Sequence, residues 1–305
     1  MSIPFRRGAL LVALAAISTA LPALALEDSR TWRETKTFTA GGGPRILELD
    51  GFRGDIVATG ISATATRGDA VEIVVHEKVT GRSKAEIDEA RRQVTVDLSQ
   101  QGNRVKIYVD GPFRCHDREN NRENNREQCR NCTCGDRDKD RVGQRVTYDF
   151  ELRVPAGTEI DLGTVMGDVR VDGSDGAFKV SSVNGKVEMA GVRGAGTARS
   201  VNGPVKVTFA ANPNGDCRFE TVNGELDVAF RPGLGADLSF KTLNGEVYTD
   251  FPYKQRSLAA LAGDRQDGRF VLRKAGAFGI TIGGGGPELA FATINGDILV
   301  RNQDH

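Results

Sequence analysis

One short phrase returns along the second half of the chain, and this repetition constrains the fold more than any other feature. It consists of Ser or Thr, an aliphatic residue, Asn-Gly, any residue and a second aliphatic residue. Clear copies lie at 182–189, 200–207, 221–228, 242–249 and 293–300, and a divergent copy with Met in place of Asn lies at 164–171. The glycines of the first five copies are spaced 18, 18, 21 and 21 residues apart, and the last follows after 51. A period of this length is typical of stacked, near-identical units, so the phrase predicts a repeat scaffold.

Two arrangements of strands fit the phrase. In a β-solenoid each copy is one coil, and the asparagines stack at one corner. In a meander each Asn-Gly is the two-residue turn of an ordinary hairpin, because Asn-Gly favours positive φ. The constant spacing of near-identical copies favours the solenoid. The predicted turn residues are Asn184, Gly185, Asn202, Gly203, Asn223, Gly224, Asn244, Gly245, Asn295 and Gly296.

The same face is apolar in every copy. In the unit at 219–230, Phe219 and Thr221 share one parity before the turn, and Leu226, Val228 and Phe230 share one parity after it. Strands alternate their side chains between two faces, so stacked units would bury this face continuously. The corresponding inward candidates in the other copies are Val180, Val187, Met189, Val205, Val207, Phe209, Phe240, Val247, Phe251, Phe291, Ile298 and Val300.

Residues 1–25 have the features of a signal peptide. Arg6 and Arg7 precede an apolar run, and Ala23-Leu24-Ala25 fits a cleavage site. The run is too short for a comfortable membrane span, and no later apolar run reaches that length. We expect a mature protein without a transmembrane segment, exported to the periplasm, the cell surface or the medium, in an oxidising compartment.

The mature chain divides into two regions. Residues 26–155 are expected to form a strand-rich part in which a polar lead-in at 26–44 precedes strands near 46–49, 55–59, 71–75, 94–98, 105–109 and 146–154. Ser83 and Glu86 form a capping box that predicts one short helix. Residues 156–305 carry the repeats, interrupted by an insertion at 252–290 that is expected to hold a short helix at 257–261 and strands at 270–272 and 278–282.

A charged loop at 115–141 contains most of the cysteines. Cys115, Cys129, Cys132 and Cys134 lie on either side of an Arg-Glu-Asn-Asn tract. Export favours disulfides among them, in any of three pairings, whereas thiolates beside His116 are also suitable ligands for zinc. We predict disulfides, no bound metal and no cofactor. Cys217 stands apart in the repeats and is expected to be a buried thiol.

The residues that directly follow the phrase glycines would form a second column in a stacked fold. It contains Asp168, Lys186, Pro204, Glu225, Glu246 and Asp297. Stacked carboxylates can bind calcium, which prefers oxygen ligands. Since Lys186 and Pro204 interrupt the column, we interpret it as a row of solvated turns.

The phrase and the strand–helix–strand segment at 71–109 resemble the putative adhesin family of secreted β-strand-repeat proteins, and are similar to the head GIN domains of putative autotransporter adhesins. The resemblance covers most of the mature chain. It implies a right-handed β-solenoid-like fold at the cell envelope, with no catalytic residues to transfer.

The sequence therefore predicts an all-β protein, a right-handed β-solenoid-like stack of Asn-Gly repeats after a strand-rich part with one short helix. We expect a non-catalytic adhesion, interaction or display module with an envelope protein or glycan as partner. Lys plus Arg equals Asp plus Glu at 41 each, which argues against nucleic acid as the partner. The alternatives are a polysaccharide-acting β-helix enzyme, which needs a pair of carboxylates, and a metal-binding or metal-sensing protein that uses the loop from Cys115 to Cys134.

Overall fold

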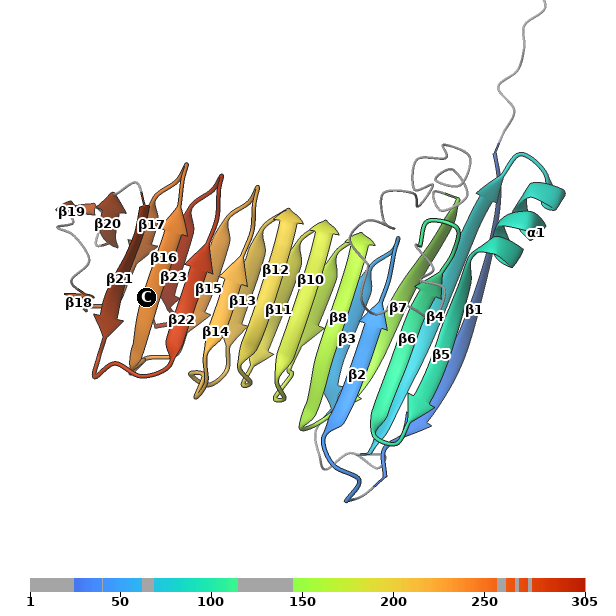
Figure 1. Ribbon diagram of the computed structural model, residues 1–305, viewed down its shortest axis with the longest axis horizontal. Coiled ribbons are helices and arrows are strands. Elements are labelled where there is room, and N and C mark those ends of the chain that lie inside the picture. Colours follow the sequence, from blue (N-terminus) through green and yellow to red (C-terminus); the bar gives the residue numbers. More distant parts are fainter. Residues whose placement is uncertain are drawn as a thin grey trace, which may run out of the picture.

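The computed structural model describes residues 25–39, 41–61, 69–114, 145–256, 262–266, 269–273 and 276–304 (Figure 1). Within these ranges the chain consists almost entirely of β-strands, with one α-helix, α1 (Lys84–Gln93). The predicted all-β class is confirmed. The cysteine-rich loop and residues 1–24 lie outside the described residues, so the predictions made for them stay predictions.

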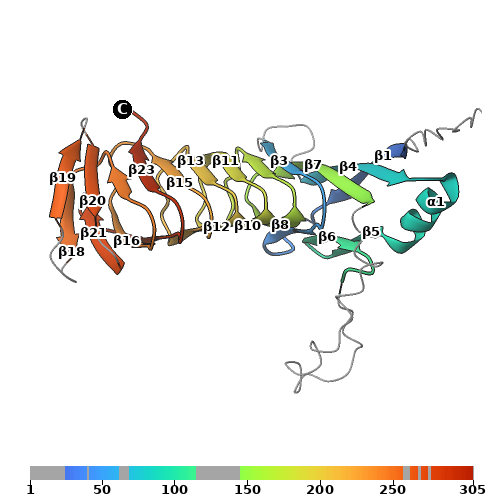
Figure 2. The same cartoon turned by 90° about the horizontal axis from the view of Figure 1, so that it is seen from above.

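The strands form two sheets that lie face to face along the length of the molecule (Figure 2). Sheet A contains, in spatial order, β1 (Leu26–Thr37), β4 (Ala70–Gly81), β7 (Val146–Pro155), β3 (Ile56–Ile61), β9 (Val169–Asp172), β11 (Val187–Val192), β13 (Val205–Phe209), β15 (Leu226–Phe230), β23 (Ile298–Asn302), β17 (Val247–Thr249), β20 (Arg269–Arg273) and β19 (Ala262–Gln266). Sheet B contains β18 (Tyr253–Arg256), β21 (Gly276–Ile282), β16 (Ala236–Thr242), β22 (Glu288–Ala292), β14 (Cys217–Glu220), β12 (Gly196–Asn202), β10 (Phe178–Asn184), β8 (Thr158–Met166), β2 (Arg45–Asp50), β6 (Arg104–Asp110) and β5 (Thr95–Gln101).

Consecutive strands from β8 to β17 alternate between the two sheets, and each pairs in parallel with strands of the neighbouring repeats. Val187 of β11, for example, is in register with Val169 of β9 on one side and Val205 of β13 on the other. The strands before and after each Asn-Gly therefore lie in different sheets and do not pair with each other. This pairing excludes the hairpin meander, because a hairpin turn joins two antiparallel neighbours.

The repeats do not stack in the order of the sequence. The last copy, formed by β22 and β23, lies between the layer of β14 and β15 and the layer of β16 and β17 (Figure 1). After β17 the chain passes beyond the end of the stack in β18–β21 and then returns to fill this internal layer. Every layer offers the same parallel edge and the same apolar face, so local sequence does not specify which copies are neighbours.

The core between the sheets is continuous and follows the predicted parity. Phe219, Leu226, Val228 and Phe230 are each fully buried, and every other inward candidate of the repeats is at most 4% exposed. Aromatic rings contact each other from layer to layer in sheet B, where Phe219, Phe291, Phe240 and Phe278 are successively 5.1, 5.2 and 5.1 Å apart between ring centroids. Burial of this kind stabilises a fold by about 25 cal/mol per Å² of apolar surface.

The N-terminal end of the stack is built differently from the sequence-based prediction. Residues 26–37 form the edge strand β1, not a polar lead-in, and pair antiparallel with β4 along their whole length. The strand was not predicted because most of its side chains are exposed and six of its twelve residues are charged, so it lacks an apolar alternation. Charged residues on an edge strand discourage pairing with other chains.

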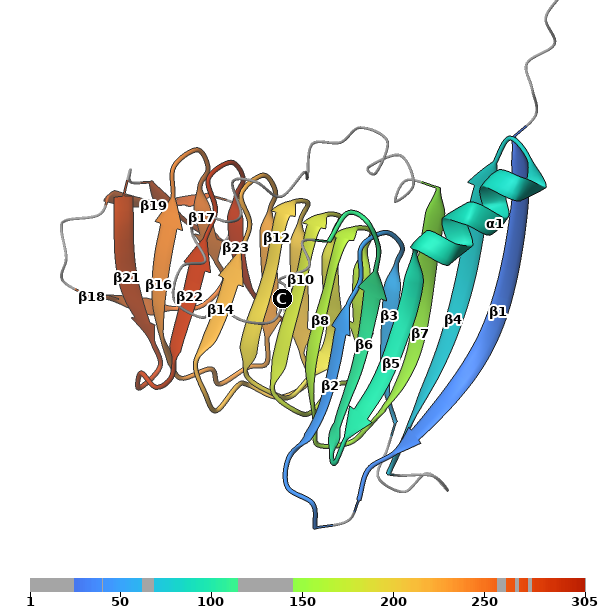
Figure 3. The same ribbon diagram turned by 45° about the vertical axis from the view of Figure 1, so that its right-hand side comes forward.

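Helix α1 connects β4 of sheet A to β5 of sheet B at this end (Figure 3). The capping box is confirmed in part: the Glu86 N–H donates to Ser83 Oγ at 3.3 Å, while the Glu86 side chain accepts from the N–H of Arg82. Ile87 and Ala90 bury the inner face of the helix.

The buried carboxylate of Glu77, on β4, joins helix α1 to the two strands that flank β4, which are β1 and β7. The Glu77 side chain is fully buried on β4 and accepts hydrogen bonds from Arg30 of β1 (2.8 Å), Arg91 of α1 (2.8 Å) and the Tyr148 hydroxyl of β7 (3.0 Å). Burial and the Glu77 charge raise the pKa of Tyr148, which keeps its hydroxyl protonated and able to donate. The cluster satisfies a charge that would otherwise be costly to bury.

The C-terminal end is closed by antiparallel strands. β21 pairs with β16 and β18, and β20 pairs with β17 and β19. The predicted strands at 270–272 and 278–282 are confirmed, whereas the predicted helix at 257–261 lies outside the described residues.

The register is tested by two substitutions in one repeat. Val228→Asp places an unpaired carboxylate in the core between Val207 and Val300, and should cost more than about 3 kcal/mol of unfolding free energy or abolish folding. Glu225→Ala removes an exposed side chain and should change stability by less than about 0.5 kcal/mol. Urea unfolding followed by circular dichroism measures both, and equal midpoints would contradict the register.

Candidate functional site: the Asn-Gly corner

We use the name Asn-Gly corner for the edge of the stack where each phrase carries the chain from sheet B to sheet A. Within the described part of the chain, seven layers contribute to it. Their phrase glycines are, in spatial order, Gly54, Gly167, Gly185, Gly203, Gly224, Gly296 and Gly245. The predicted turn residues are thus brought together in one column, although they are spread over more than one hundred positions of sequence.

Glycine is required here by packing between layers. A Cβ atom built on Gly185 would lie 1.9 Å from the carbonyl oxygen of Gly167, and one on Gly224 would lie 2.2 Å from that of Gly203. No side chain fits in these gaps. Neighbouring backbones can approach to strand-pairing distance at the corner only because the position has no Cβ.

The asparagines form a ladder of side-chain hydrogen bonds. Asn202 donates from Nδ2 to Oδ1 of Asn184 at 2.8 Å, and Asn223 donates to Asn202 at the same distance. Asn295 then donates to Asn223, and Asn244 to Asn295, each at 2.7 Å. An amide is suited to this role because it carries both a donor and an acceptor, so each member can bond above and below.

A second ladder lies just inside the first. The hydroxyls of Ser182, Ser200 and Thr221 donate to the glycine carbonyl of the preceding layer at 2.8, 2.8 and 2.9 Å. Thr242, in the last layer of the corner, is buried and has no hydrogen-bond partner for its hydroxyl among the described residues. The Ser or Thr of the phrase thus satisfies a carbonyl that the turn would leave unpaired.

The acidic residues that follow the glycines also bind backbone. Asp55 accepts from the N–H of Asp168 at 2.8 Å, Asp168 from that of Lys186 at 2.9 Å, and Asp297 from that of Glu246 at 2.8 Å. Across the part of the chain that the structure describes, no three His, Cys, Asp or Glu side chains gather as metal ligands would. The hydrogen bonds to backbone N–H groups give Asp55, Asp168 and Asp297 a structural role in the turns.

An exposed row of aliphatic side chains runs along the outside of the corner. It arises because the residue between the buried Ser or Thr and the Asn must point outward in an extended strand. Val183, Ile294 and Leu243 are 38%, 44% and 68% exposed, and Val165, Val201 and Val222 are half-buried. We call these six residues the aliphatic row. Sequence reasoning missed the row because it followed the inward parity, although the recurring Val, Leu or Ile before each Asn was the available signal.

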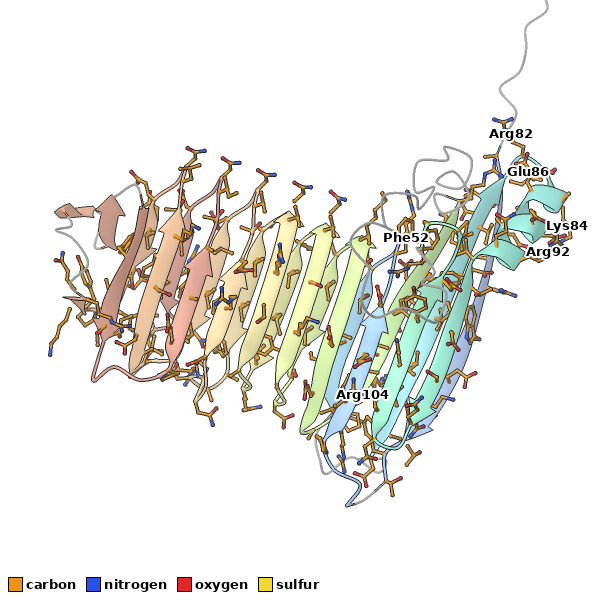
Figure 4. The ribbon with its side chains drawn as sticks, in the orientation of Figure 1. Phe52, Arg82, Lys84, Glu86, Arg92 and Arg104 are labelled. Atoms are coloured by element: carbon orange, nitrogen blue, oxygen red, sulfur yellow. The ribbon has the colours of Figure 1, made fainter. Side chains whose placement is uncertain are left out.

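The chain covers one end of the row itself. Phe52 holds the same phrase position in the first layer, at the N-terminal end of the corner (Figure 4). Its ring stacks on Phe113 with centroids 3.7 Å apart and planes 11° apart. Arg114 fixes this turn by donating to the Asp50 carboxylate at 2.9 Å and to the Gly51 carbonyl at 3.0 Å. An apolar side chain from a neighbouring segment can therefore pack on this position of the corner.

A polar hollow of about 350 Å³ lies on the outer face of sheet B, lined in part by Glu48, Asp50, Lys106, Asp161 and Lys179. Gly163 also lines the hollow. Asp161 pairs with Lys179 at 2.8 Å, Asp50 pairs with Arg114, and Glu48 pairs with Arg104. Each carboxylate of the hollow is thus held by a cation.

Of the five cysteines in the sequence, the structure describes only Cys217. Cys115, Cys129, Cys132 and Cys134 lie outside the described residues. Cys217 is a free thiol at the start of β14, 3% exposed, and its burial raises the pKa of the thiol to about 11.

The packing requirement at the corner predicts different effects for two glycine substitutions. Gly224→Ala should lower the free energy of unfolding by about 2 kcal/mol or more, because its Cβ would force two layers apart. Gly284→Ala, whose Cβ would meet nothing within 4 Å, should change stability by less than about 0.5 kcal/mol. Thermal unfolding of both variants measures the difference. A Gly224→Ala variant as stable as Gly284→Ala would show that the layers are not in this contact.

Comparison with known proteins gives no family. No family model matches the sequence, and no curated protein matches it. Among solved structures, the chain is similar to a putative cell adhesion protein from Clostridium sporogenes, with 13% identity and a TM-score of 0.40 over 90% of this chain and 100% of the other. It is also similar to a putative adhesin from Parabacteroides distasonis, with 9% identity and a TM-score of 0.20 over 90% and 98% of the two chains. Both TM-scores are below 0.5, so neither similarity assigns a function. No described helix is long and apolar enough to cross a membrane.

Proposed function

We propose that this protein is a non-catalytic, exported module of the cell envelope that binds a partner protein through the aliphatic row. The observation that carries the proposal is the row itself, a line of outward aliphatic side chains repeated layer after layer. Contiguous exposed apolar surface on a soluble protein commonly marks an interaction site.

The contact between Phe52 and Phe113 supports an apolar partner. There the protein's own chain supplies an aromatic ring that covers the first position of the corner. A partner that presents Phe, Leu or Ile side chains along an extended segment would cover the remaining positions in the same way. Neighbouring strands are spaced by about 4.8 Å, so the row presents its aliphatic side chains to a partner at a regular interval.

The scaffold that we propose for this display is a right-handed β-solenoid-like stack. Parallel pairing of like on like, the asparagine ladder and the continuous core support it. A stack of this kind holds the row in a fixed geometry, which lowers the entropy cost of binding. The ion-paired carboxylates of the hollow on sheet B support a non-catalytic role, because glycoside hydrolysis needs one carboxyl free to donate a proton.

The aliphatic row is tested by binding to an isolated envelope fraction. The double variant Leu243→Ser/Ile294→Ser should lose most of the saturable binding of the mature protein, measured by biolayer interferometry. The control variant Lys206→Ser/Lys241→Ser changes exposed side chains elsewhere on the stack and should bind as the wild type does. Equal binding by both variants, or release of reducing sugar ends from the envelope by the wild type, would contradict the proposal.

Export is also part of the proposal. We infer that residues 1–25 are removed and that Cys115, Cys129, Cys132 and Cys134 pair as two disulfides in the oxidising compartment. Cys217 would then be the single free thiol among the five cysteines of the chain.

A thiol count on protein isolated from the envelope tests this inference. The native protein should show no reactive thiol at neutral pH, because Cys217 is buried and its pKa, raised to about 11, leaves almost no thiolate. After unfolding in denaturant one thiol should react, and N-terminal sequencing should begin near Leu26. Several free thiols with bound zinc would instead favour the metal-binding hypothesis.

A further inference from the structure

The sequence contains six Asn-Gly steps, and this dipeptide has a specific chemical weakness. The backbone nitrogen of the glycine can attack the side-chain carbonyl carbon of the asparagine, because glycine offers little steric hindrance. The steps are Asn184-Gly185, Asn202-Gly203, Asn214-Gly215, Asn223-Gly224, Asn244-Gly245 and Asn295-Gly296. Five belong to the Asn-Gly corner, and Asn214-Gly215 lies in an exposed turn before β14.

Four of the corner steps are protected by the stack. The N–H groups of Gly185, Gly203, Gly224 and Gly296 each donate to the carbonyl of the asparagine in the next layer, at 3.1, 3.0, 2.9 and 2.9 Å. A nitrogen that donates to a neighbouring strand points away from its own asparagine side chain. Attack then requires the layer to open first, which costs free energy.

The asparagine side chains add a second restraint. Asn202, Asn223 and Asn295 are inside the ladder, where each amide donates to one neighbour and accepts from the other. Asn184, at one end, accepts from Asn202, and the N–H of Gly185 is still bonded. These side chains cannot turn toward the following nitrogen without breaking the ladder.

Asn244-Gly245 differs because no further phrase stacks on it. Within the described ranges the N–H of Gly245 has no hydrogen-bond acceptor. Among the described residues, the only side-chain hydrogen bond of Asn244 is the one it donates to Asn295, at 2.7 Å. Asn244 and Gly245 are both exposed, and Leu243 beside them is 68% exposed.

We propose that Asn244-Gly245 is a site of spontaneous deamidation in the folded protein, set apart from the other corner steps by its place at the end of the ladder. The Gly245 nitrogen forms a bond to Cγ of Asn244, and the Cγ–Nδ2 bond breaks. The proton from the nitrogen leaves with the amine as ammonia, which produces a succinimide ring. Water from solvent then opens the ring at either carbonyl, giving aspartate or isoaspartate.

The product changes the end of the stack. A carboxylate replaces the Nδ2 donor that faces the Oδ1 atom of Asn295, so an attractive contact becomes a repulsive one. Isoaspartate also adds a methylene to the backbone. In the unmodified protein the Asn244 carbonyl accepts a hydrogen bond from the N–H of Gly296 at 2.9 Å, and the added methylene displaces this carbonyl. Deamidation would therefore loosen the last layer, where the aliphatic row is most exposed.

The test uses the wild-type protein and its own unprotected step as reference. Folded protein is incubated in mildly alkaline buffer, and the same protein is incubated unfolded in urea. Conversion at each of the six steps is followed by peptide mapping and mass spectrometry. The N–H of Gly215 likewise has no acceptor within the described ranges, so Asn214 reports the rate of a free step in the folded state.

We expect Asn214 and Asn244 to convert in the folded protein at least about tenfold faster than Asn202, Asn223 and Asn295, because only the latter must open a bonded layer. Asn184 should also convert slowly. In urea all six steps should convert at rates within a few-fold of one another. Conversion of Asn244 no faster than Asn223 in the folded protein overturns the proposal, as does persistence of the same ranking in urea. Neither result depends on whether the aliphatic row binds a partner.

Discussion

The close approach of backbone to backbone at the Asn-Gly corner determines much of what the rest of the structure can do. A glycine in each layer lies so near the carbonyl of the next that a methyl group would not fit between them. This contact sets the register of the strands on either side, because both continue directly from it. Once the register is set, the asparagine ladder, the hydroxyl ladder and the inward apolar face align by the same repetition.

The strands at both ends of the stack depart from this repetition, and in each case the departure changes how the open sheet edge is protected. A parallel stack leaves open edges that would pair with other chains. At the N-terminal end the charged strand β1 forms the edge of sheet A. Helix α1 lies beside it, and the buried Glu77 with its arginine and tyrosine partners connects the helix to these strands. At the C-terminal end antiparallel strands pair with the final layer of the stack, where a further parallel layer would otherwise follow. In spatial order the final phrase of the stack is the one at Asn244, where the asparagine ladder stops, and the proposed deamidation site therefore lies in that layer.

The local pattern of residues in the sequence was sufficient to predict which side chains of the repeats are buried and where the helix lies. Phe219, Val228 and the other inward residues follow from strand parity alone, and the helix at 84–93 follows from its cap and apolar face. Strand β1 was not predictable in this way, since its stability comes from pairing with β4 and not from an apolar pattern of its own. The position of β22 and β23 within the stack was also not predictable, because layers with near-identical sequences do not specify which layers they pair with. The aliphatic row was present in the sequence but acquires meaning only once the corner places its members side by side.

The order of the layers is the central claim of this account, and one cross-linking measurement tests it directly. Val222 and Ile294 lie in adjacent layers of the aliphatic row, whereas Val222 and Leu243 are two layers apart. Adjacent parallel strands are separated by about 4.8 Å, within the Cα distance that a disulfide spans, whereas two layers exceed it. Under mild oxidation the variant Val222→Cys/Ile294→Cys should form the intramolecular disulfide, identified by peptide mapping, and Val222→Cys/Leu243→Cys should not. Efficient cross-linking of the second pair and none of the first would show that the repeats stack in the order of the sequence and would contradict the structure.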